Sequence, residues 1–298
     1  MHEPKSKQTA QIAPAGLAFL VITSIGWGSN WPATKYLLGQ LPPLTYRGVM
    51  GLVGAALLAS LAGLRGQSLR VPEGMWGRII LSATFNVTCW MILIGFALLW
   101  LPASEVALIG YTMPVWAAII AWPVLGEKPT VLRTTALFMA LAGLATIMGG
   151  NGISASWEKL PGIVLALGGA IGFAFGTVFA KKLPIQMPPL SSAAWQILIG
   201  CLPITLIGLA IETTDVFAIT QLGWILIVYV TIMQYCVAYV SWFAALARLP
   251  ASIASIGTIG VPIVGVVASA VTLHEPLGAG KIAALLFTLA SVVLATRA

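Results

Sequence analysis

Two amide side chains lie in the middle of long apolar stretches, where a hydrogen-bonding group needs a partner. Asn86 lies near the centre of the stretch 76–100, and Gln234 lies near the centre of the stretch 221–247. Because an amide both donates and accepts hydrogen bonds, such a pair suits a zwitterionic ligand. The alternative is that each amide bonds only to a neighbouring helix and meets no ligand.

Aromatic side chains are the second group that could bind a ligand. Outside the first apolar stretch the candidates are Trp90, Tyr111, Tyr235, Tyr239 and Trp242. The last three are spaced at i, i+4 and i+7, so they would form one stripe along a helix. Their rings could stack against a flat or cationic ligand. Packing against a neighbouring helix explains the same stripe equally well.

The first apolar stretch, 15–38, carries a third group. Trp27, Asn30 and Trp31 share one helical face with two threonines, and such a polar face should point into the protein interior. We expect it to line a binding site, because two tryptophans are too bulky for a tight helix interface. The alternative is that this face bonds only to other helices.

Two prolines interrupt apolar stretches and are candidate hinges. Pro114 and Pro262 each lack a backbone N–H, so we expect a kink at each position. The carbonyl groups freed by the kinks could face a central cavity, or the kinks could only shape the helix bundle.

Both prolines belong to a segment that the chain contains twice. Residues 101–127 and 249–275 align without a gap at an offset of 148, and both begin with Leu-Pro-Ala-Ser and end in glutamate. The chain is therefore two copies of one unit. The same offset relates Asn86 to Gln234, so we expect the two amides near a pseudo-two-fold axis.

The composition identifies an integral membrane protein. Hydrophobic residues make up 59% of the chain and charged residues 8%, whereas a soluble domain has about 25% charged residues. Apolar runs of about 20 residues, each long enough to cross a bilayer core of about 30 Å, recur along the chain. The predicted spans are 15–38, 43–64, 76–100, 103–124, 130–150, 160–183, 190–211, 221–247, 251–273 and 278–296.

We predict an all-α fold in which these ten transmembrane helices form two five-helix repeats around a central cavity. The first repeat covers residues 15–150 and the second covers 151–298, after a tail at 1–14. Because five is an odd number, the second repeat enters the membrane inverted relative to the first. Of the 15 lysines and arginines, eleven fall on the side of the termini and four on the other, which predicts cytoplasmic termini.

The ten-span plan and the duplicated segment resemble the drug/metabolite transporter superfamily, specifically its EamA-type exporters. The run GWGSN at 26–30 resembles the first-helix signature of that family, and Arg47 resembles its helix-two arginine. Within the superfamily the chain is most similar to exporters of aromatic amino acids and methyl viologen. The resemblance implies alternating-access efflux, across the bacterial inner membrane, of aromatic or other neutral amino acids and flat organic cations.

The placement of titratable groups bears on energy coupling. None of the eight acidic residues lies at the centre of a predicted span, and both histidines, His2 and His274, lie in loops. A proton antiporter usually keeps such a group in the membrane interior. We therefore expect facilitated, uniport-like transport. The alternative is a proton-coupled antiporter in which Glu105, at the start of the fourth span, reaches the cavity.

Two other classes of membrane protein fit the sequence poorly. An intramembrane protease would need paired carboxylates within its spans or an HExxH motif, and the sequence has neither, so we do not expect an enzyme. A channel would need a ring of charges or a carbonyl-lined filter, and no such pattern is visible.

Charged residues near span ends have more than one interpretation. Glu127 and Glu275 are expected to cap the next helix or to pair with Lys128 or Lys281. Arg47 enters the second span near its outer end, where it could extend to the interface or attract a substrate carboxylate.

The remaining patterns concern partners and cofactors. The sixth span carries Gly168, Gly172 and Gly176, a spacing that permits close helix packing within a monomer, with a homodimer face as the alternative. The three cysteines lie in apolar spans without CxxC spacing, so we expect no disulfide, metal or cofactor. The formal charge of +7 follows from the loop charges and does not indicate nucleic acid. The expected partners are a small-molecule substrate and the lipid bilayer.

Overall fold

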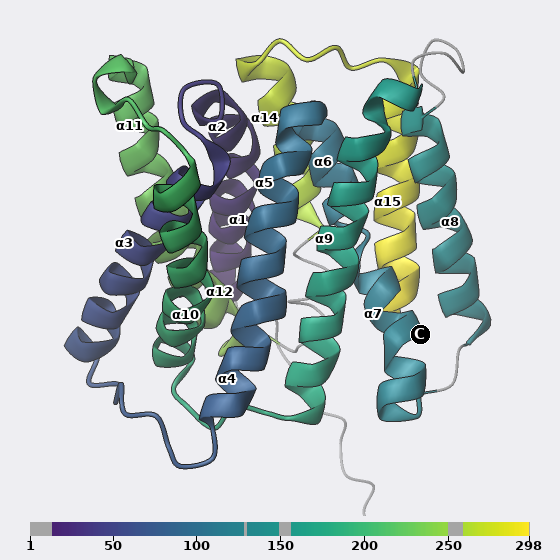
Figure 1. Cartoon of the computed structure of the whole chain (residues 1–298). Helices are drawn as coiled ribbons and strands as arrows, with labels where there is room; N and C mark the ends of the chain where they lie inside the picture. Colours follow the sequence, from purple (N-terminus) through teal and green to yellow (C-terminus); the bar gives the residue numbers. More distant parts are fainter. Residues whose placement is uncertain (1–13, 128–129, 149–155, 250–258, 298) are drawn as a thin grey trace, which may run out of the picture.

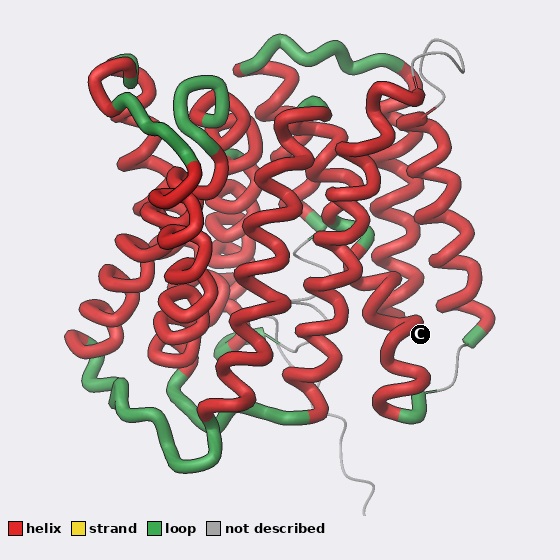
Figure 2. The backbone as a smooth tube through the Cα atoms, viewed as in Figure 1, coloured by secondary structure: helices red, strands yellow, loops and turns green. Residues whose placement is uncertain are grey.

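The structure, a computed structural model, describes residues 14–127, 130–148, 156–249 and 259–297. In these residues the chain forms helices joined by loops, and Figure 2 draws no strand among them. The predicted tail at 1–14, apart from Pro14, the first part of the ninth span and Lys128 lie outside the described residues.

The helices of the first half stand along the bundle, and the short ones cover only part of its length, with α2 at the top and α4 at the bottom of Figure 1. They are α1 Pro14–Gly28, α2 Asn30–Leu37, α3 Pro43–Leu64, α4 Trp76–Ala83, the π-helix η1 Thr84–Cys89, α5 Trp90–Trp100, α6 Ala103–Gly110, α7 Met113–Leu125 and α8 Val131–Met148. The second half repeats this plan. Its elements are α9 Ser156–Lys182, α10 Pro189–Ile211, the 3₁₀ turn η3 Val216–Ala218, α11 Gln221–Val230, the π-helix η4 Thr231–Ala238, α12 Tyr239–Leu246, α14 Gly260–Thr272 and α15 Ala279–Arg297.

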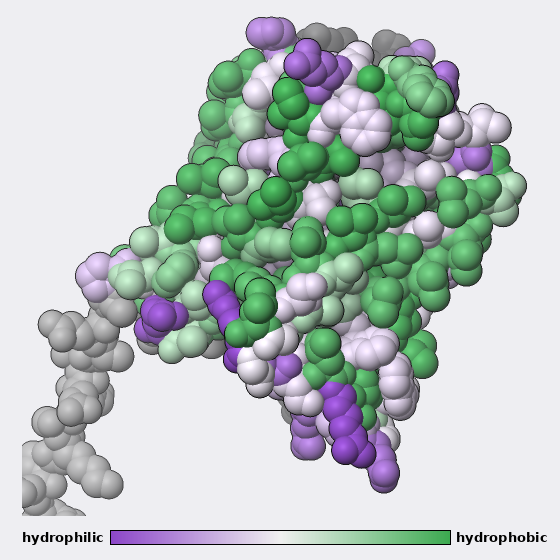
Figure 3. Space-filling view, turned by 90° about the vertical axis from the view of Figure 1, so that its left-hand side faces the viewer, coloured by the Kyte–Doolittle hydropathy of each residue, from purple (hydrophilic) through white to green (hydrophobic). Residues whose placement is uncertain are grey.

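The predicted spans correspond closely to these helices. In the described residues, six helical segments, some made of adjoining helices, are long and apolar enough to cross a membrane, and three shorter helices are also apolar. The first predicted span is divided at Ser29 into α1 and α2, so neither piece reaches that length. Figure 3 shows hydrophobic side chains over the middle of one face, with hydrophilic ones gathered towards its top and bottom. The chain is therefore an all-α membrane protein.

The second span of each half shows that the two halves are inverted. The backbone N–H of Thr45, at the start of α3, donates to Glu212 just after α10 at 2.7 Å. The N–H of Leu190, at the start of α10, donates to Gln67 just after α3 at 3.2 Å. The two helices are therefore antiparallel, although they occupy the same place in their repeats.

The fifth spans confirm the inversion. A Cβ placed on Gly143, near the end of α8, would lie 3.2 Å from the Cβ of Phe287 in α15. A Cβ on Gly280, at the start of α15, would lie 3.4 Å from the carbonyl oxygen of Thr146. The end of α8 therefore meets the beginning of α15.

Two carboxylates fix one end of the bundle, here called the Glu275 end. Glu275 accepts from the backbone N–H groups of Ala103 and Ser104 at 2.7 and 3.2 Å, and from the Ser104 hydroxyl. It therefore caps α6, whose first N–H groups have no partner within the helix. Glu212 caps α3 in the same way, through Leu44 and Thr45. Each cap joins the two halves of the chain.

The opposite end, here called the Arg65 end, carries its own contacts between halves. Besides the bond between Gln67 and Leu190, Arg78 donates to the carbonyl oxygen of Pro184 at 2.8 Å, and Lys181 donates to Glu127 at 2.6 Å. Glu127 therefore pairs with Lys181, a lysine that the sequence did not indicate as its partner, because the contact joins residues from different repeats.

The three glycines of α9 pack against the first half of the same chain. A Cβ on Gly168 would lie 3.5 Å from Leu93, and one on Gly172 would lie 3.6 Å from Cys89. A Cβ on Gly176 would lie 2.1 Å from the side-chain oxygen of Asn86. The glycine face is thus covered within the chain, as the packing interpretation predicted.

Candidate functional site

A cavity of about 260 Å³ lies between the two halves. It is bounded by α1, α2, α3, η1, α5, α9, α10, η4 and α12, together with residues at the junction of α6 and α7. The lining residues are Trp27, Asn30, Trp31, Thr34, Arg47, Asn86, Val87, Trp90, Met91, Ile94, Leu98, Tyr111, Met113, Phe173, Ile197, Gln234, Tyr239, Trp242 and Phe243. Nine of the ten residues predicted to contact a ligand are among them.

Both predicted amides lie in π-helical segments. Asn86 is in η1, which interrupts the third span, and Gln234 is in η4, which interrupts the eighth. At the repeat offset of 148, residues 84–89 correspond to 232–237, which lie inside η4. Single π-helical turns within α-helices occur frequently at functional sites. The interruption is therefore a property of the repeat unit, and it presents one amide from each half to the cavity.

The two amides differ in their hydrogen bonds. The Asn86 amide donates to the Ser82 hydroxyl at 3.0 Å, and that hydroxyl donates to Gln196 at 2.7 Å. Gln196 in turn donates to Ser192 at 3.0 Å, so Asn86 begins a polar chain between α4 and α10. The described residues provide no hydrogen bond to the side chain of Gln234. Asn86 therefore reaches α10 only through Ser82 of its own span, its side-chain oxygen is buried without a partner, and neither amide bonds directly to another span in the described residues.

Aromatic rings form two groups around the amides. Trp27 lies edge-on to Tyr239, with ring centroids 5.6 Å apart, and its centroid is 5.9 Å from that of Trp242. Trp31 lies edge-on to both Trp90 and Tyr111, at 6.3 and 6.4 Å. Edge-to-face pairs at these separations are favourable for aromatic rings. The rings therefore support one another, and all six of these residues line the cavity.

Phe173 extends the second aromatic group and was not among the predicted contacts. Its ring centroid lies 5.2 Å from that of Trp90. A signal for it existed in the sequence, because Phe173 corresponds to Trp27 when the first spans of the two repeats are aligned at an offset of 146.

Tyr235 lies outside the cavity, unlike the rest of the predicted stripe. Its side chain is 2% exposed and packs against α3, where a Cβ on Gly54 would lie 2.3 Å from its ring. The predicted stripe assumed α-helical geometry throughout. Tyr235 lies inside η4, where i→i+5 bonding changes the angular spacing of side chains, so it does not share the cavity-lining face of Tyr239 and Trp242.

The fourth span is broken rather than kinked. The break falls at Tyr111 and Thr112, between α6 and α7, and Pro114 lies in the first turn of α7. A proline there removes no helical bond, because the first N–H groups of a helix have no partner. Pro262 likewise lies in the first turn of α14. At Pro114 the span is thus interrupted just before the proline, while for Pro262 the expected kink stays a prediction, because residues 250–258 lie outside the described residues.

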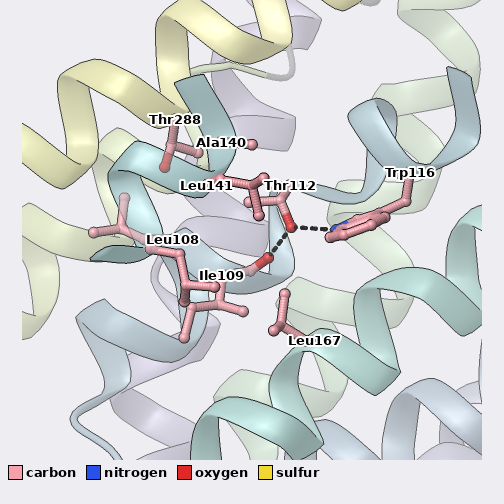
Figure 4. A pocket seen from close by; sticks show the side chains of 9 residues that line it. Leu108, Ile109, Thr112, Trp116, Ala140, Leu141, Leu167 and Thr288 are labelled. Atoms are coloured by element: carbon pink, nitrogen blue, oxygen red, sulfur yellow. Dashed lines mark hydrogen bonds between the residues drawn. The ribbon is translucent and has the colours of Figure 1, made fainter. Parts of the chain in front are cut away.

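Side-chain bonds stabilise the break between α6 and α7 (Figure 4). The Thr112 hydroxyl donates to the carbonyl oxygen of Ile109 at 2.6 Å and accepts from the Trp116 indole at 3.0 Å. The adjoining space is a separate pocket of about 10 Å³ with mainly apolar walls. This pocket is too small for a ligand. The break instead bears on ligand binding through Tyr111, which it places at the main cavity.

Arg47 also lines the cavity, whereas the sequence left open whether it turns inward or extends to the interface. It lies in the second turn of α3, is 7% exposed, and donates from Nη2 to the sulfur of Met91 at 2.9 Å. Its Nε is buried without a partner. Arg47 is therefore turned inward and does not extend to the membrane interface.

The carboxylates near span ends do not line the cavity. Glu105, 4% exposed, pairs with Lys159 at 2.9 Å. Glu275 pairs with Lys281 at 3.4 Å, as expected, in addition to capping α6. These carboxylates form contacts between the ends of different helices: Glu105 joins α6 to α9, and Glu275 joins the segment after α14 to α6.

No group of three or more histidine, cysteine or acidic side chains that could hold a metal occurs in the described residues. The three cysteines are unbridged.

Comparison with known proteins supports this arrangement. The chain is 32% identical over 281 residues to the uncharacterized transporter YvbV of Bacillus subtilis, covering 93% of this chain and 89% of the relative. It is 24% identical to a probable amino-acid metabolite efflux pump of Salmonella typhimurium, covering 93% and 92% of the two chains. It is 26% identical to a probable terminal-alkyne amino-acid exporter of Streptantibioticus cattleyicolor, covering 86% and 84%.

One solved crystal structure has the same fold, with a TM-score of 0.69 at 18% identity over 96% of this chain and 98% of the other. The family described as the EamA-like transporter family matches twice, over residues 14–149 and 160–297. These relatives are named as transporters and not as enzymes. Because the two matches together cover most of the chain, the protein belongs to the EamA-like transporter family, within the drug/metabolite transporter superfamily.

Proposed function

We propose that this transporter exports amino acids or amino-acid-like metabolites across the bacterial inner membrane by alternating access. The observation that carries the proposal is the cavity between the inverted halves, to which each half contributes an amide from a π-helical segment. Inverted repeats with a midplane site are the usual architecture of secondary transporters.

The size and lining of the cavity support a small, partly apolar substrate. Its volume of about 260 Å³ lies just below the range of about 300–1,000 Å³ typical of sites for drug-sized ligands. Amides can pair with the polar groups of an amino acid, and the rings can pack against its side chain. Two relatives carry amino acids in their names, as a metabolite efflux pump and an exporter. Flat organic cations are not part of the proposal, because Arg47 lines the same cavity.

Alternating access would proceed by exchange of contacts at the two ends of the bundle. At the Glu275 end, Glu275 and Glu212 join the halves through the caps of α6 and α3. At the Arg65 end, the halves are joined by Gln67 with Leu190 and by Lys181 with Glu127. Opening either end requires its own set of contacts to separate while the other set holds.

We further propose uniport-like transport without proton coupling. Among the described lining residues, arginine and tyrosine are the titratable types, and both ordinarily keep one protonation state near neutral pH. Glu105, the candidate for the proton-coupled alternative, is instead engaged by Lys159. The termini are proposed to be cytoplasmic on the basis of the loop charges. A monomer is proposed because the glycine face of α9 is already covered.

The direct test is transport into proteoliposomes. Purified protein should exchange tritiated L-phenylalanine, L-tryptophan and L-leucine with the same unlabelled amino acid trapped inside, and protein-free liposomes should not. Exchange of tetraphenylphosphonium or methyl viologen in place of these amino acids would overturn the proposed substrate class.

A further inference from the structure

The cavity contains a buried positive charge that the described part of the chain does not neutralise. The guanidinium of Arg47 borders the cavity and makes a single hydrogen bond there, from Nη2 to the thioether sulfur of Met91. A thioether is a weak acceptor, whereas a guanidinium has five N–H donors and stays charged. A buried charge without a counter-ion is costly, so such a group is normally paired.

The carboxylates of the described residues are engaged or remote. Three of them pair with Lys159, Lys181 and Lys281. Glu212 accepts from the start of α3 with both of its oxygens. The others, Glu73, Glu158 and Asp215, are exposed. Within the described residues, no carboxylate is therefore left to pair with Arg47.

The repeat provides no second cation for the cavity. The position equivalent to Arg47 at an offset of 148 is Trp195, whose indole donates to the carbonyl oxygen of Leu69 and whose ring packs edge-on against Trp76. Among the described lining residues, Arg47 alone is charged. The site thus has one positive end, close to the start of α3, while the rest of it is neutral and largely aromatic.

We propose that Arg47 binds the carboxylate of the transported substrate, so that a carboxylate is required for recognition and simple amines are rejected. This inference rests on the proposed function, which it deepens by naming the substrate group that the site selects. A guanidinium and a carboxylate can form two parallel hydrogen bonds, which fix orientation as well as charge. The side chain of the substrate then extends from Arg47 towards the rings of Trp27 and Trp242.

The side chain of Arg47 is closely packed against a neighbouring helix. A Cβ on Gly95 would lie 2.8 Å from the Cδ of Arg47, so α5 packs closely against the arginine side chain. Nη2 donates to Met91 and Nε is buried without a partner, so the guanidinium keeps unused donors where it borders the cavity.

The test is competition binding with purified protein in detergent. Tritiated L-phenylalanine is the probe, and the competitors are 3-phenylpropanoate, which lacks the ammonium, and phenethylamine and L-phenylalaninamide, which lack the carboxylate. We expect 3-phenylpropanoate to displace the probe and the other two to fail at the same concentration. Displacement by phenethylamine as strong as that by 3-phenylpropanoate would overturn the inference.

Variants of Arg47 provide the second arm. Loss of charge-assisted hydrogen bonds should weaken phenylalanine binding about 10- to 100-fold in Arg47→Gln. The affinity of Arg47→Lys for phenylalanine should lie between those of the wild type and Arg47→Gln, because lysine keeps the charge but not the paired donors. Arg65→Gln, at the exposed end of the same helix, is the matched control and should bind as the wild type does. A folded Arg47→Gln protein with unchanged affinity contradicts the inference.

The two arms separate this inference from the proposed function. Wild-type protein that binds none of phenylalanine, tryptophan and leucine overturns the proposed substrate class, and the inference with it. Wild-type protein that binds them but does not distinguish acids from amines overturns only the role of Arg47. If Arg47→Gln does not fold, the competition series with the wild type still decides.

Discussion

Asn86 and Gln234 occupy equivalent positions in the two inverted halves, and each lies within a π-helical interruption of its span. The two side chains border one cavity, but only Asn86 is hydrogen-bonded to another side chain in the described residues, through Ser82. The two halves therefore share the π-helical backbone at this position but differ in the hydrogen bonds of the amide that it carries.

The first prediction concerns these amides. Gln234→Ala should lower the rate of amino-acid exchange about 2- to 10-fold, because one hydrogen bond contributes about 0.5–1.5 kcal/mol. Its melting temperature should stay close to that of the wild type, since no bond within the described residues is lost. Asn86→Ala should lower exchange similarly and also destabilise the protein slightly, by removing the bond to Ser82. Exchange at the wild-type rate in both variants, or unfolding of both, would show that the two amides serve the packing of the protein and do not contact the substrate.

The second prediction uses the glycines of α9 as a matched pair. Gly176→Ala should reduce both stability and transport, because the new Cβ would lie 2.1 Å from the Asn86 oxygen, and overpacking of this kind costs about 1–3 kcal/mol. Gly172→Ala should be neutral or slightly stabilising, because its nearest neighbour, the Cβ of Cys89, would be 3.6 Å away. Thermal unfolding in detergent measures both effects. Equal behaviour of the two variants contradicts the close contact between α9 and η1.

The third prediction concerns the cap of α6. Glu275→Ala should destabilise the protein by about 1–2 kcal/mol, because the N–H groups of Ala103 and Ser104 lose their acceptor. Glu73→Ala is the control, because Glu73 lies in an exposed loop. Chemical unfolding in mixed micelles gives the difference in free energy. A difference near zero would show that water replaces the cap without cost.

The fourth prediction concerns membrane orientation. Ser68 follows α3, and Thr213 follows α10, so the two exposed residues lie at opposite ends of the bundle. In a variant lacking the three native cysteines, an impermeant maleimide added to intact cells should label Thr213→Cys and not Ser68→Cys. Labelling of Ser68→Cys alone would reverse the proposed orientation. Labelling of both in cells shown to be intact would contradict the inverted arrangement.

The fifth prediction concerns energy coupling. Counterflow of phenylalanine in proteoliposomes should proceed without a pH gradient, and an imposed gradient should not drive accumulation. Glu105→Gln should leave this insensitivity to the pH gradient unchanged, because Glu105 pairs with Lys159 away from the cavity lining. Accumulation that needs the gradient and disappears in Glu105→Gln would replace uniport by proton antiport.

Much of the fold follows from the sequence, because each membrane span has to satisfy its backbone hydrogen bonds within itself. Apolar length and helix-ending residues alone therefore define the spans, and the second span was predicted at the same bounds as α3, 43–64. The duplicated segment likewise predicts the inversion, since five spans per copy permit no other insertion. Asn86 and Gln234 stand out because polar side chains are rare in such spans.

What the tertiary structure decided depends on helix register and on contacts between halves. The turn of Tyr235 out of the cavity follows from the π-helical geometry of η4, which a 3.6-residue period does not anticipate. The pairing of Glu127 with Lys181 and the cap that Glu275 forms on α6 join residues 54 or more positions apart. Arg47 was ambiguous in the sequence, because a residue near a span end can turn outward or inward. The packing of α3 against α5 turns it inward, and that orientation makes it the one charged group found in the cavity lining of the described chain.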